Sequence, residues 1–374
     1  MIPTKPYTIP VAEPAIGEEE LANVVDAVKS GWVSSKGSYI TAFEKNFANY
    51  IGLKHGIAVA NGTTALHLAL VSLGIGPGDQ VIVPDLTFAA TINAVLYTGA
   101  KPIIVDIDLD YWCIDPRQLE AAVTSKTKAI IPVHLYGHSC DMDPIIEIAQ
   151  KHNLSIIDDA AEAIGAEYKD KKVGSLGLIS CFSFYGNKVI TTGEGGMCLT
   201  DDDQLASQMR ILRDHGMNPN KQFWHDIIGF NYRMTNLQAA LGVAQLNKVE
   251  EFIAKKRFIA KLYAEALSGL EDISLHPQMP WAKNIYWLYS ILINGGTITR
   301  DSLRKALASK GIDSRPFFYP LHEMPPYRKI TSKKYPNSTK ISEVGLSLPS
   351  SVKLTVDDVL YVTQAVKSAV NNTV

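Results

Sequence analysis

The sequence has few cysteines for its length. It contains four in 374 residues, and none belongs to a Cys-x-x-Cys pair. The chain therefore shows no readable zinc site or redox motif, and a disulfide framework is not expected at this density. We predict no metal site and a reducing compartment, the cytoplasm. The cysteines are Cys113, Cys140, Cys181 and Cys198.

Net charge and long apolar runs are also lacking. The formal charge is −2, with 46% hydrophobic and 20% charged residues, and this argues against a general nucleic-acid binder because neutralising phosphates requires a basic surface. Apolar runs such as residues 65–71 are far shorter than the ~20 residues of a membrane span. The N-terminal segment lacks the apolar core of a signal peptide. What remains is an ordinary globular chain, long enough for one large domain and a smaller one.

The first two thirds of the chain alternate short β-branched runs with longer amphipathic ones. Strands that alternate with helices at this spacing predict crossover units, and hence an α/β fold whose mainly parallel, seven-stranded sheet has helices on both faces. The expected strands are 56–60, 80–84, 101–105, 129–133, 154–158, 179–184 and 196–199, and the expected helices are 64–74, 89–99, 116–123 and 143–152.

The pattern changes after about residue 233. A long helical segment is expected over 236–267, and the elements after it predict a smaller C-terminal α+β domain. We therefore divide the chain into residues 1–245, an N-terminal segment with the large cofactor-binding domain, and 246–374, a linking helix with the small domain. A cleft between two such domains is a common place for a ligand. The later elements are a strand at 286–293, a helix at 299–310, a strand at 312–318 and a last helix at 356–370.

A possible anion site follows the first expected strand. In "ANGTTALHLAL", Gly62, Thr63 and Thr64 stand at a helix start, where free backbone N–H groups can bind a phosphate. The same residues could form a plain helix cap with Asn61, and both interpretations stay open. The turn is neither a Walker loop nor the dinucleotide fingerprint Gly-x-Gly-x-x-Gly.

Carboxylates follow another expected strand. In "LSIIDDAAEAIG" an apolar run ends in Asp158 and Asp159, followed by small residues and Glu162. The carboxyl end of a parallel strand is where open α/β sheets present ligand-binding groups. An Asp-Asp pair can also simply cap the next helix, but one aspartate suffices for that. A buried aspartate facing a cationic heterocycle would use the space that the small residues leave.

Lys188, in "FSFYGNKVITTGEGG", lies between a strand-like run and a glycine cluster. Burying an amine is unfavourable unless it is neutral or paired, and burial lowers its pKa; such a lysine suits Schiff-base chemistry. Taken singly, Phe88 could be a core residue and Ser183 an ordinary strand serine. Pyridoxal 5′-phosphate, however, needs a lysine, a carboxylate for its ring nitrogen, phosphate donors and a flat side chain over its ring. The chain offers all four on an α/β frame.

These motifs resemble the DegT/DnrJ/StrS-type nucleotide-sugar aminotransferases, over essentially the whole chain and in order. The resemblance implies the aspartate-aminotransferase fold (fold type I) and a homodimer with shared active sites. It also implies pyridoxal phosphate held as a Schiff base by the lysine. The matching stretches are "GWVSSKGSYITAFE", "NGTTALHLAL", "VIVPDLTFAATINAV", "PVHLYG", "IIDDAAEAIGA", "FSFYGNKVITTGEGGM", "GFNYRMTNLQAALGVAQL" and "SRPFFYPLHEMPPY".

The resemblance also assigns roles to single residues. Lys188 matches the catalytic lysine, Asp159 the partner of the ring nitrogen, and Phe88 the aromatic residue stacked on the ring. Glu162 matches a residue close to the cofactor's hydroxyl side, and Asn231 an asparagine that reaches the phosphate from the other subunit. The phosphate site would be formed by Gly62, Thr63, Thr64 and Ser183, and the substrate site by Trp32, Arg315, Tyr319 and His322.

Three positions bear on how far this likeness extends. Relatives usually have glutamate at Asp158, a departure that should not touch the ring-nitrogen contact, and many have tyrosine at Phe88. A related branch of sugar 3-dehydratases has histidine in place of the lysine, whereas Lys188 is present here.

The expected reaction is a ping-pong amino transfer from L-glutamate to C4 of a nucleotide-linked 4-keto-6-deoxy sugar. The freed Lys188 amine would act as general base and acid. We expect a GDP-linked 4-keto-6-deoxy-mannose, with a UDP- or TDP-linked keto hexose, aminated at C4 or C3, as the alternative. A cofactor-binding homologue without turnover is disfavoured because the lysine–aspartate–phosphate set is intact. The missing glycine fingerprint disfavours a nicotinamide oxidoreductase.

Overall fold

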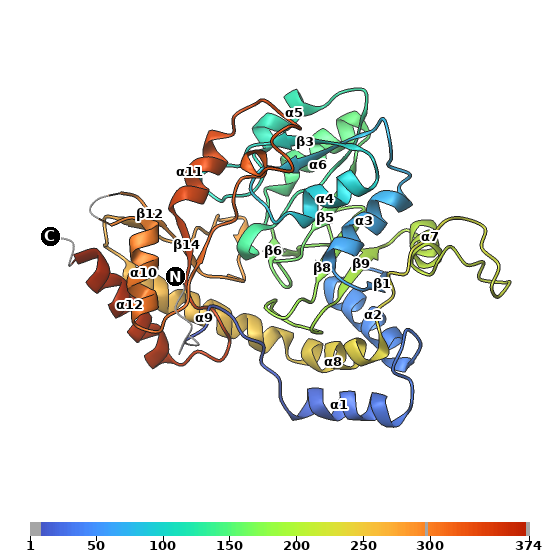
Figure 1. The fold of residues 1–374 in the computed structure, drawn as a ribbon, viewed down its shortest axis with the longest axis horizontal. Coiled ribbons are helices and arrows are strands. Elements are labelled where there is room, and N and C mark those ends of the chain that lie inside the picture. Colours follow the sequence, from blue (N-terminus) through green and yellow to red (C-terminus); the bar gives the residue numbers. More distant parts are fainter. Residues whose placement is uncertain (1–8, 296–297, 372–374) are drawn as a thin grey trace.

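A seven-stranded sheet forms the centre of the protein (Figure 1). The computed structural model describes residues 9–295 and 298–371; the first eight residues of the N-terminal segment lie outside this range. The strands run in the order β1-β9-β8-β5-β4-β2-β3. They are β1 (His55–Val59), β2 (Gln80–Pro84), β3 (Lys101–Val105), β4 (Thr127–Ile130), β5 (Ser155–Asp159), β8 (Ile179–Ser183) and β9 (Gly196–Thr200).

The sheet is mainly parallel, as predicted. Strands β8, β5, β4, β2 and β3 run parallel to one another, whereas β9 is antiparallel to both β1 and β8. Every residue of β8 and β9 is buried, which is typical of strands covered on both faces. All seven expected strands are present, with ends shifted by a few residues.

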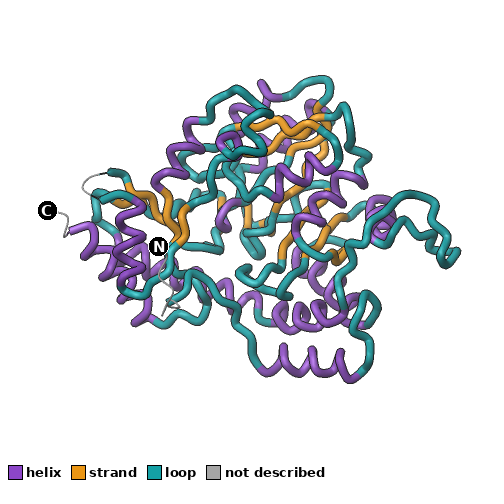
Figure 2. Tube along the Cα trace, viewed as in Figure 1, coloured by secondary structure: helices purple, strands orange, loops and turns teal. Residues whose placement is uncertain are grey.

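Helices cover both faces of this sheet (Figure 2). One face packs against α3 (Gly62–Ser72), α4 (Ala90–Tyr97) and α7 (Asp203–Arg213), whose apolar residues share one core cluster. The other face packs against α2 (Ser38–Ile51), α5 (Leu119–Ala122), which follows the short helix η1 (Pro116–Gln118), and α6 (Met142–His152). Residues 65–70 of α3 are all buried, so this helix is enclosed by protein around its start.

The predicted long helix over 236–267 is two helices, a correction to the sequence-based assignment. Helix α8 (Asn236–Asn247) ends at Lys248, whose backbone leaves helical geometry, and α9 (Val249–Leu267) begins directly after it. The Lys248 amine lies 2.7 Å from the buried carboxylate of Glu20, in α1 (Glu18–Lys29), which packs along α8. The ion pair between Lys248 and Glu20 lies at this junction. The apolar periodicity of the sequence continues unbroken through it, so the sequence pattern gave no sign of the break.

A second, four-stranded sheet lies next to α9, α10 (Arg300–Ser309) and α12 (Val356–Asn371), with its own core cluster. Its strands are antiparallel in the order β10-β12-β14-β13. The α+β character agrees with the prediction, whereas the boundary at residues 245 and 246 stays a prediction. The strands are β10 (Ile273–Ser274), β12 (Ser290–Ile293), β13 (Arg315–Pro316) and β14 (Gly345–Ser347).

Two predicted strands of this region are shorter than expected. The segment 286–293 is a strand only over 290–293, because Tyr286 has a left-handed backbone with φ of 49°. The segment 312–318 is a strand only at residues 315–316, where Pro316 lacks the N–H that would continue the ladder, and Ile312 forms an isolated parallel bridge with Ile9.

The sequence also did not predict several elements of the fold. These are α1, α2, α7, β10, β14, α11 (Pro336–Val344), the short helices η2 (Leu135–Gly137) and η3 (Leu321–Glu323), and a small sheet of β6 (Glu167–Tyr168), β7 (Lys171–Lys172) and β11 (Ala282–Lys283). Within residues 9–295 and 298–371, no helix is long and apolar enough to cross a membrane.

Candidate active site

A cavity of about 510 Å³ lies where the two sheets approach each other. One wall consists of residues that follow β1, β2, β5 and β8, and the other of Trp287, Arg315 and Phe318. The strand ends that form the first wall are the carboxyl ends of the parallel strands β2, β5 and β8, which is the usual place of a site in an open α/β sheet. The cavity gathers eight of the predicted site residues: Gly62, Thr63, Phe88, Asp159, Glu162, Ser183, Lys188 and Arg315.

Lys188 follows β8 and projects into this cavity. Its Nζ lies 3.4 Å from Glu162 Oε1 and 3.7 Å from the centroid of the Trp287 ring. Burial lowers the pKa of the Lys188 amine, against the opposing effect of the Glu162 and Asp159 carboxylates. A buried amine with a lowered pKa is neutral more often than an ordinary lysine, and it is therefore a better nucleophile.

Asp159 is the last residue of β5 and is buried. Its Oδ2 accepts a hydrogen bond of 2.8 Å from Thr91 Oγ1, and its Oδ1 accepts one of 3.3 Å from the backbone N–H of Ala161. Burial raises the pKa of Asp159, although these hydrogen bonds and the Lys188 amine act in the opposite direction. A buried carboxylate that lacks a direct cationic partner is suited to share a proton with a ring nitrogen.

Glu162 is held by the backbone close to the lysine. Its Oε2 accepts a hydrogen bond of 2.9 Å from the N–H of Tyr136, and Oε1 faces Lys188. Burial raises the pKa of Glu162, while the Lys188 charge lowers it. Burial thus favours the neutral forms of both groups, so it reduces the free energy needed to move a proton from the Lys188 ammonium to the Glu162 carboxylate.

The turn at the start of α3 borders the cavity and forms a helix cap. The Asn61 side chain accepts from the N–H of Thr64, whose hydroxyl donates to the Asn61 carbonyl. The Thr64 hydroxyl is therefore used in the helix cap, and the Thr64 side chain does not line the cavity. The N–H groups of Gly62 and Thr63 belong to the first helical turn, which no preceding helical carbonyl can satisfy. A Cβ on Gly62 would lie 2.9 Å from Ser183 Cβ, so only glycine leaves space beside Ser183 at this position. We call the turn of Gly62 and Thr63 the glycine cradle.

Phe88 lies at the rim of the cavity and is 58% exposed. Its ring centroid is 5.7 Å from that of Phe318, whose N–H donates to the Tyr136 hydroxyl. An exposed aromatic ring that lines the same cavity as Asp159 and Lys188 is available to stack on a flat ligand.

The remaining predicted residues lie outside the cavity wall. Asn231 is exposed and accepts a hydrogen bond from Arg233 Nε. Trp32 and Tyr319 are more than half exposed. The His322 ring lies against buried Asp85, with 2.7 Å between Nδ1 and Oδ2.

The neighbour of Asp159 also lies outside the cavity. Asp158 is fully buried, and its Oδ2 accepts a hydrogen bond from the N–H of Gly177. The departure from the usual glutamate at this position therefore lies away from the cavity, on the other side of β5.

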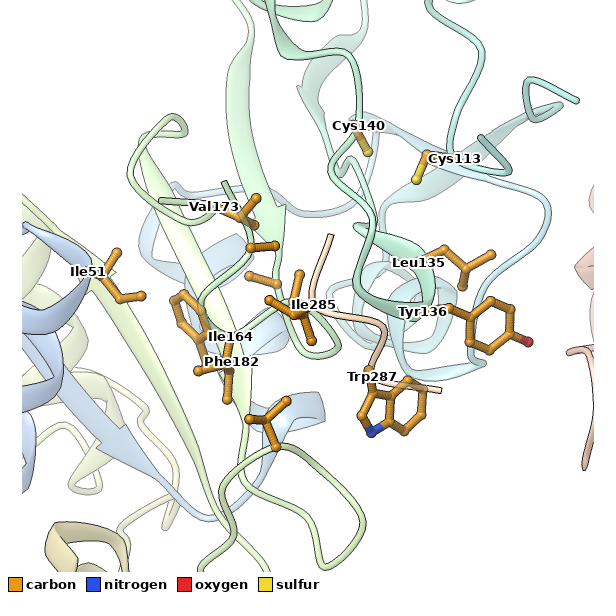
Figure 3. Packing of buried hydrophobic residues seen from close by; sticks show 14 of the residues in the cluster. Ile51, Cys113, Leu135, Tyr136, Cys140, Ile164, Val173, Phe182, Ile285 and Trp287 are labelled. Carbon is orange, nitrogen blue, oxygen red and sulfur yellow. The ribbon is translucent and has the colours of Figure 1, made fainter. Parts of the chain in front are cut away.

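Several cavity residues were not predicted from the sequence. Trp287 and Phe318 come from the second sheet's region, and Thr91 contacts Asp159 from the first turn of α4. The Tyr136 ring lies beside that of Trp287 (Figure 3). Thr91, Tyr136 and Phe318 lie within stretches that match the family but were given no role there, whereas Trp287 lies outside every matching stretch.

A buried lysine, a buried carboxylate, an exposed aromatic ring and a glycine cradle around one cavity fit pyridoxal phosphate. The fold and this site define an α/β enzyme of the pyridoxal-phosphate aminotransferase class. The chain belongs to the DegT/DnrJ/EryC1/StrS aminotransferase family, whose model matches residues 14–367. Aminotransferases of this family use pyridoxal phosphate, an amino donor and a nucleotide-sugar substrate.

Individual relatives are similar over nearly their whole length. GDP-perosamine synthase of Caulobacter vibrioides is 50% identical, with 94% of this chain and 95% of the relative covered. GDP-perosamine synthase of Escherichia coli O157:H7 is 45% identical, with coverages of 96% and 97%. Among solved structures, DesV of S. venezuelae, in complex with a ketimine intermediate, is 35% identical with a TM-score of 0.90 and 94% of both chains covered.

Proposed function

We propose that this enzyme transfers the amino group of L-glutamate to C4 of GDP-4-keto-6-deoxy-D-mannose and so forms GDP-perosamine. The observation that carries the proposal is the 50% and 45% identity, over almost the full length, to relatives named GDP-perosamine synthase. The intact cluster of Lys188, Asp159 and the Gly62 cradle supports turnover rather than binding alone.

Lys188 is proposed to do both the covalent and the acid–base work. When bound, pyridoxal phosphate supplies an electron sink and carries the amino group between donor and acceptor. The Lys188 amine binds the cofactor covalently, and once freed it accepts and returns a proton at Nζ. Asp159 keeps the ring nitrogen protonated, and Glu162 holds the amine within 3.4 Å.

The cofactor's phosphate is assigned to the open turn of α3. Gly62 and Thr63 offer backbone N–H groups, and Ser183 adds a hydroxyl at the same wall. Thr64 supports this turn through its cap with Asn61. Phe88 would cover one face of the cofactor ring.

A homodimer is part of the proposal. The segment between α7 and α8 extends away from the body of the chain (Figure 1) and carries apolar side chains in solvent, and such patches mark interaction sites. Asn231 lies in the same segment, shortly after these apolar residues, which is why we expect it to reach the cofactor phosphate of the other subunit. The exposed apolar residues are Phe223, Trp224, Ile227 and Ile228.

Arg315 is the proposed substrate residue that faces the cavity. Its guanidinium suits a carboxylate of the amino donor or the diphosphate of the sugar nucleotide. Trp32, Tyr319 and His322 are proposed to meet the substrate outside the cavity. The reaction is assigned to the cytoplasm, and the four free, buried cysteines agree with a reducing compartment.

The test is amination of defined sugar nucleotides by the purified, cofactor-loaded enzyme with L-glutamate. We expect one amino group to appear at C4 of GDP-4-keto-6-deoxy-D-mannose, identified by mass spectrometry and NMR. Amination confined to UDP- or TDP-linked keto hexoses would contradict the proposed substrate. Lys126→Ala, a substitution of an exposed lysine, serves as the matched control for variants of Lys188.

A further inference from the structure

The Lys188 amine rests on an aromatic face that the motifs did not identify. Its Nζ lies 3.7 Å from the centroid of the Trp287 ring. An ammonium group above an indole face is attracted by the ring quadrupole, whereas a neutral amine gains much less from it. Trp287 therefore touches the reacting nitrogen and distinguishes its two protonation states.

The Trp287 side chain is fixed on several sides. Its Nε1 donates a hydrogen bond of 2.8 Å to the carbonyl of Asn187, the residue before the lysine. Its own carbonyl accepts 2.9 Å from the buried amine of Lys256. The Tyr136 ring lies nearly parallel to the indole, at 15° and 6.2 Å between centroids (Figure 3). A ring held in this way presents one constant face to the lysine.

The backbone at Trp287 also lies in close contact with the turn after β4. Gly137 has a φ of +101°, and a Cβ there would lie 2.8 Å from the backbone nitrogen of Trp287. The N–H of Ile285 donates to the Gly137 carbonyl. The turn after β4, which carries Gly137 and Tyr136, therefore docks directly onto the chain that carries the indole.

The charged groups that face Lys188 are the Glu162 and Asp159 carboxylates and the Arg315 guanidinium. Burial lowers the pKa of Lys188, the two carboxylates oppose this, and Arg315 adds to it. The Glu162 carboxylate, 3.4 Å away, can take a proton from the ammonium. The indole face cannot, so it stabilises the ammonium without competing for the proton that the amine carries.

We propose that Trp287 is a further catalytic residue, whose indole face holds the Lys188 ammonium between taking up a proton and giving it back. The proton that Nζ accepts from the α-carbon of the amino donor is the one it later releases, so no other acid or base is consumed. This inference rests on the acid–base role proposed for Lys188.

The test measures the ionisation of Lys188 in the cofactor-free protein. Competitive labelling with acetic anhydride over a pH series, read by peptide mass spectrometry, gives the ionisation constant of this amine. In Trp287→Leu we expect that constant to rise between about 3-fold and 30-fold, because leucine keeps the site apolar but removes the ring face. Trp287→Phe, which keeps a weaker face, should give a smaller rise.

Trp281→Leu is the matched control. Trp281 packs on Tyr111 and Tyr168, away from the lysine, so we expect the Lys188 constant to stay within about twofold of that of the parent protein. The same constant in Trp287→Leu and Trp281→Leu would overturn the proposal. If Trp287→Leu does not fold, Trp287→Phe takes its place. A Lys188 ionisation constant in Trp287→Phe equal to that of the parent would then overturn the proposal.

The measurement contains neither cofactor nor sugar. An unchanged ionisation constant would therefore count against Trp287 alone and leave the proposed reaction standing. Failure of the proposed reaction would instead appear as missing product in the sugar-nucleotide assay.

Discussion

Two buried lysines of this protein share an environment of low polarity but differ in what surrounds the amine. Lys188 borders the cavity and faces the Glu162 carboxylate at 3.4 Å. Lys256, in α9, donates instead to the carbonyls of Trp287 and Ser350, at 2.9 and 2.8 Å, and does not line that cavity. Burial lowers the pKa of both, to about 7 for Lys256.

The difference shows that a lowered pKa does not by itself identify a catalytic amine. Lys256 has the shift that a nucleophilic lysine needs, but its amine is enclosed by backbone carbonyls and has no space for a substrate. Lys188 combines the shift with a cavity and a carboxylate that can exchange a proton with it. A perturbed pKa indicates function only together with access and partners.

Removing the Lys188 amine should give the largest effect on catalysis. We expect Lys188→Ala to reduce amino transfer by about 10³-fold or more, because the covalent and proton-transfer roles are lost together. The visible band of the lysine-bound cofactor should disappear as well. Steady-state rates and an absorption spectrum measure both effects, with Lys126→Ala as the control. A fully active Lys188→Ala enzyme would rule out the assigned role.

Asp159→Asn should have the next largest effect. An amide cannot keep the ring nitrogen protonated, so we expect the half-reaction with L-glutamate to slow by about 100-fold or more. Single-turnover spectroscopy with glutamate alone isolates this step. Asp158→Asn, a buried neighbour outside the cavity, should change the rate by less than about tenfold. Equal losses in both variants would show that the effect is structural.

Gly62→Ala should weaken cofactor binding while the lysine chemistry remains. The added methyl would lie 2.9 Å from Ser183 Cβ, so we expect the dissociation constant of pyridoxal phosphate to rise by about 10- to 100-fold. Titration of the cofactor-free protein measures it. At Gly76 a Cβ would meet only ordinary contacts, and Gly76→Ala should therefore leave the affinity unchanged. Unaltered affinity in Gly62→Ala would argue against this turn as the phosphate site.

Lys256→Met should have the smallest effect of these variants on catalysis. Its effect should appear instead in the way the free energy of unfolding depends on pH. The pKa of Lys256 is about 7 in the folded protein and about 10.4 in an unfolded chain. The unfolded state therefore binds more protons between these values, so the free energy of unfolding rises with pH across the window from 7 to 10.4. The full rise is about 5 kcal/mol.

The Lys256→Met variant lacks this contribution. Denaturant unfolding of parent and variant at a series of pH values should show a difference that grows in favour of the parent between pH 7 and 10. Turnover of the variant should stay within about tenfold of the parent, because Lys256 does not touch the cavity. A difference in unfolding free energy between parent and variant that does not depend on pH would contradict the role assigned to Lys256. A loss of activity as large as that of Lys188→Ala would contradict the distinction between the two lysines.

The first wall of the cavity could be predicted from the sequence because its chemistry is local. Each strand end carries its functional residue within a few positions: Gly62 after β1, Phe88 after β2, Asp159 at the end of β5 and Lys188 after β8. Alternation of strands and helices then brings these ends together at one edge of the sheet. The resemblance to the family named the same residues.

The second wall could not be predicted in this way. Trp287 lies in "NIYWLYS", a stretch that resembles any aromatic core segment, and it reaches Lys188 only through the packing of two sheets. The break at Lys248 was missed for a related reason, since its partner Glu20 is far away in sequence. Contacts that depend on tertiary packing produce no periodicity or spacing in the local sequence, so a local pattern cannot predict them.

The most direct test of the account is the absorption spectrum of the purified protein with pyridoxal phosphate, before and after L-glutamate is added. We predict a visible band that depends on Lys188 and that shifts to the near-ultraviolet band of the aminated cofactor on addition of glutamate. A protein that forms no visible band, or whose band ignores glutamate, would contradict the central claim that the Lys188 amine performs amino transfer from this donor.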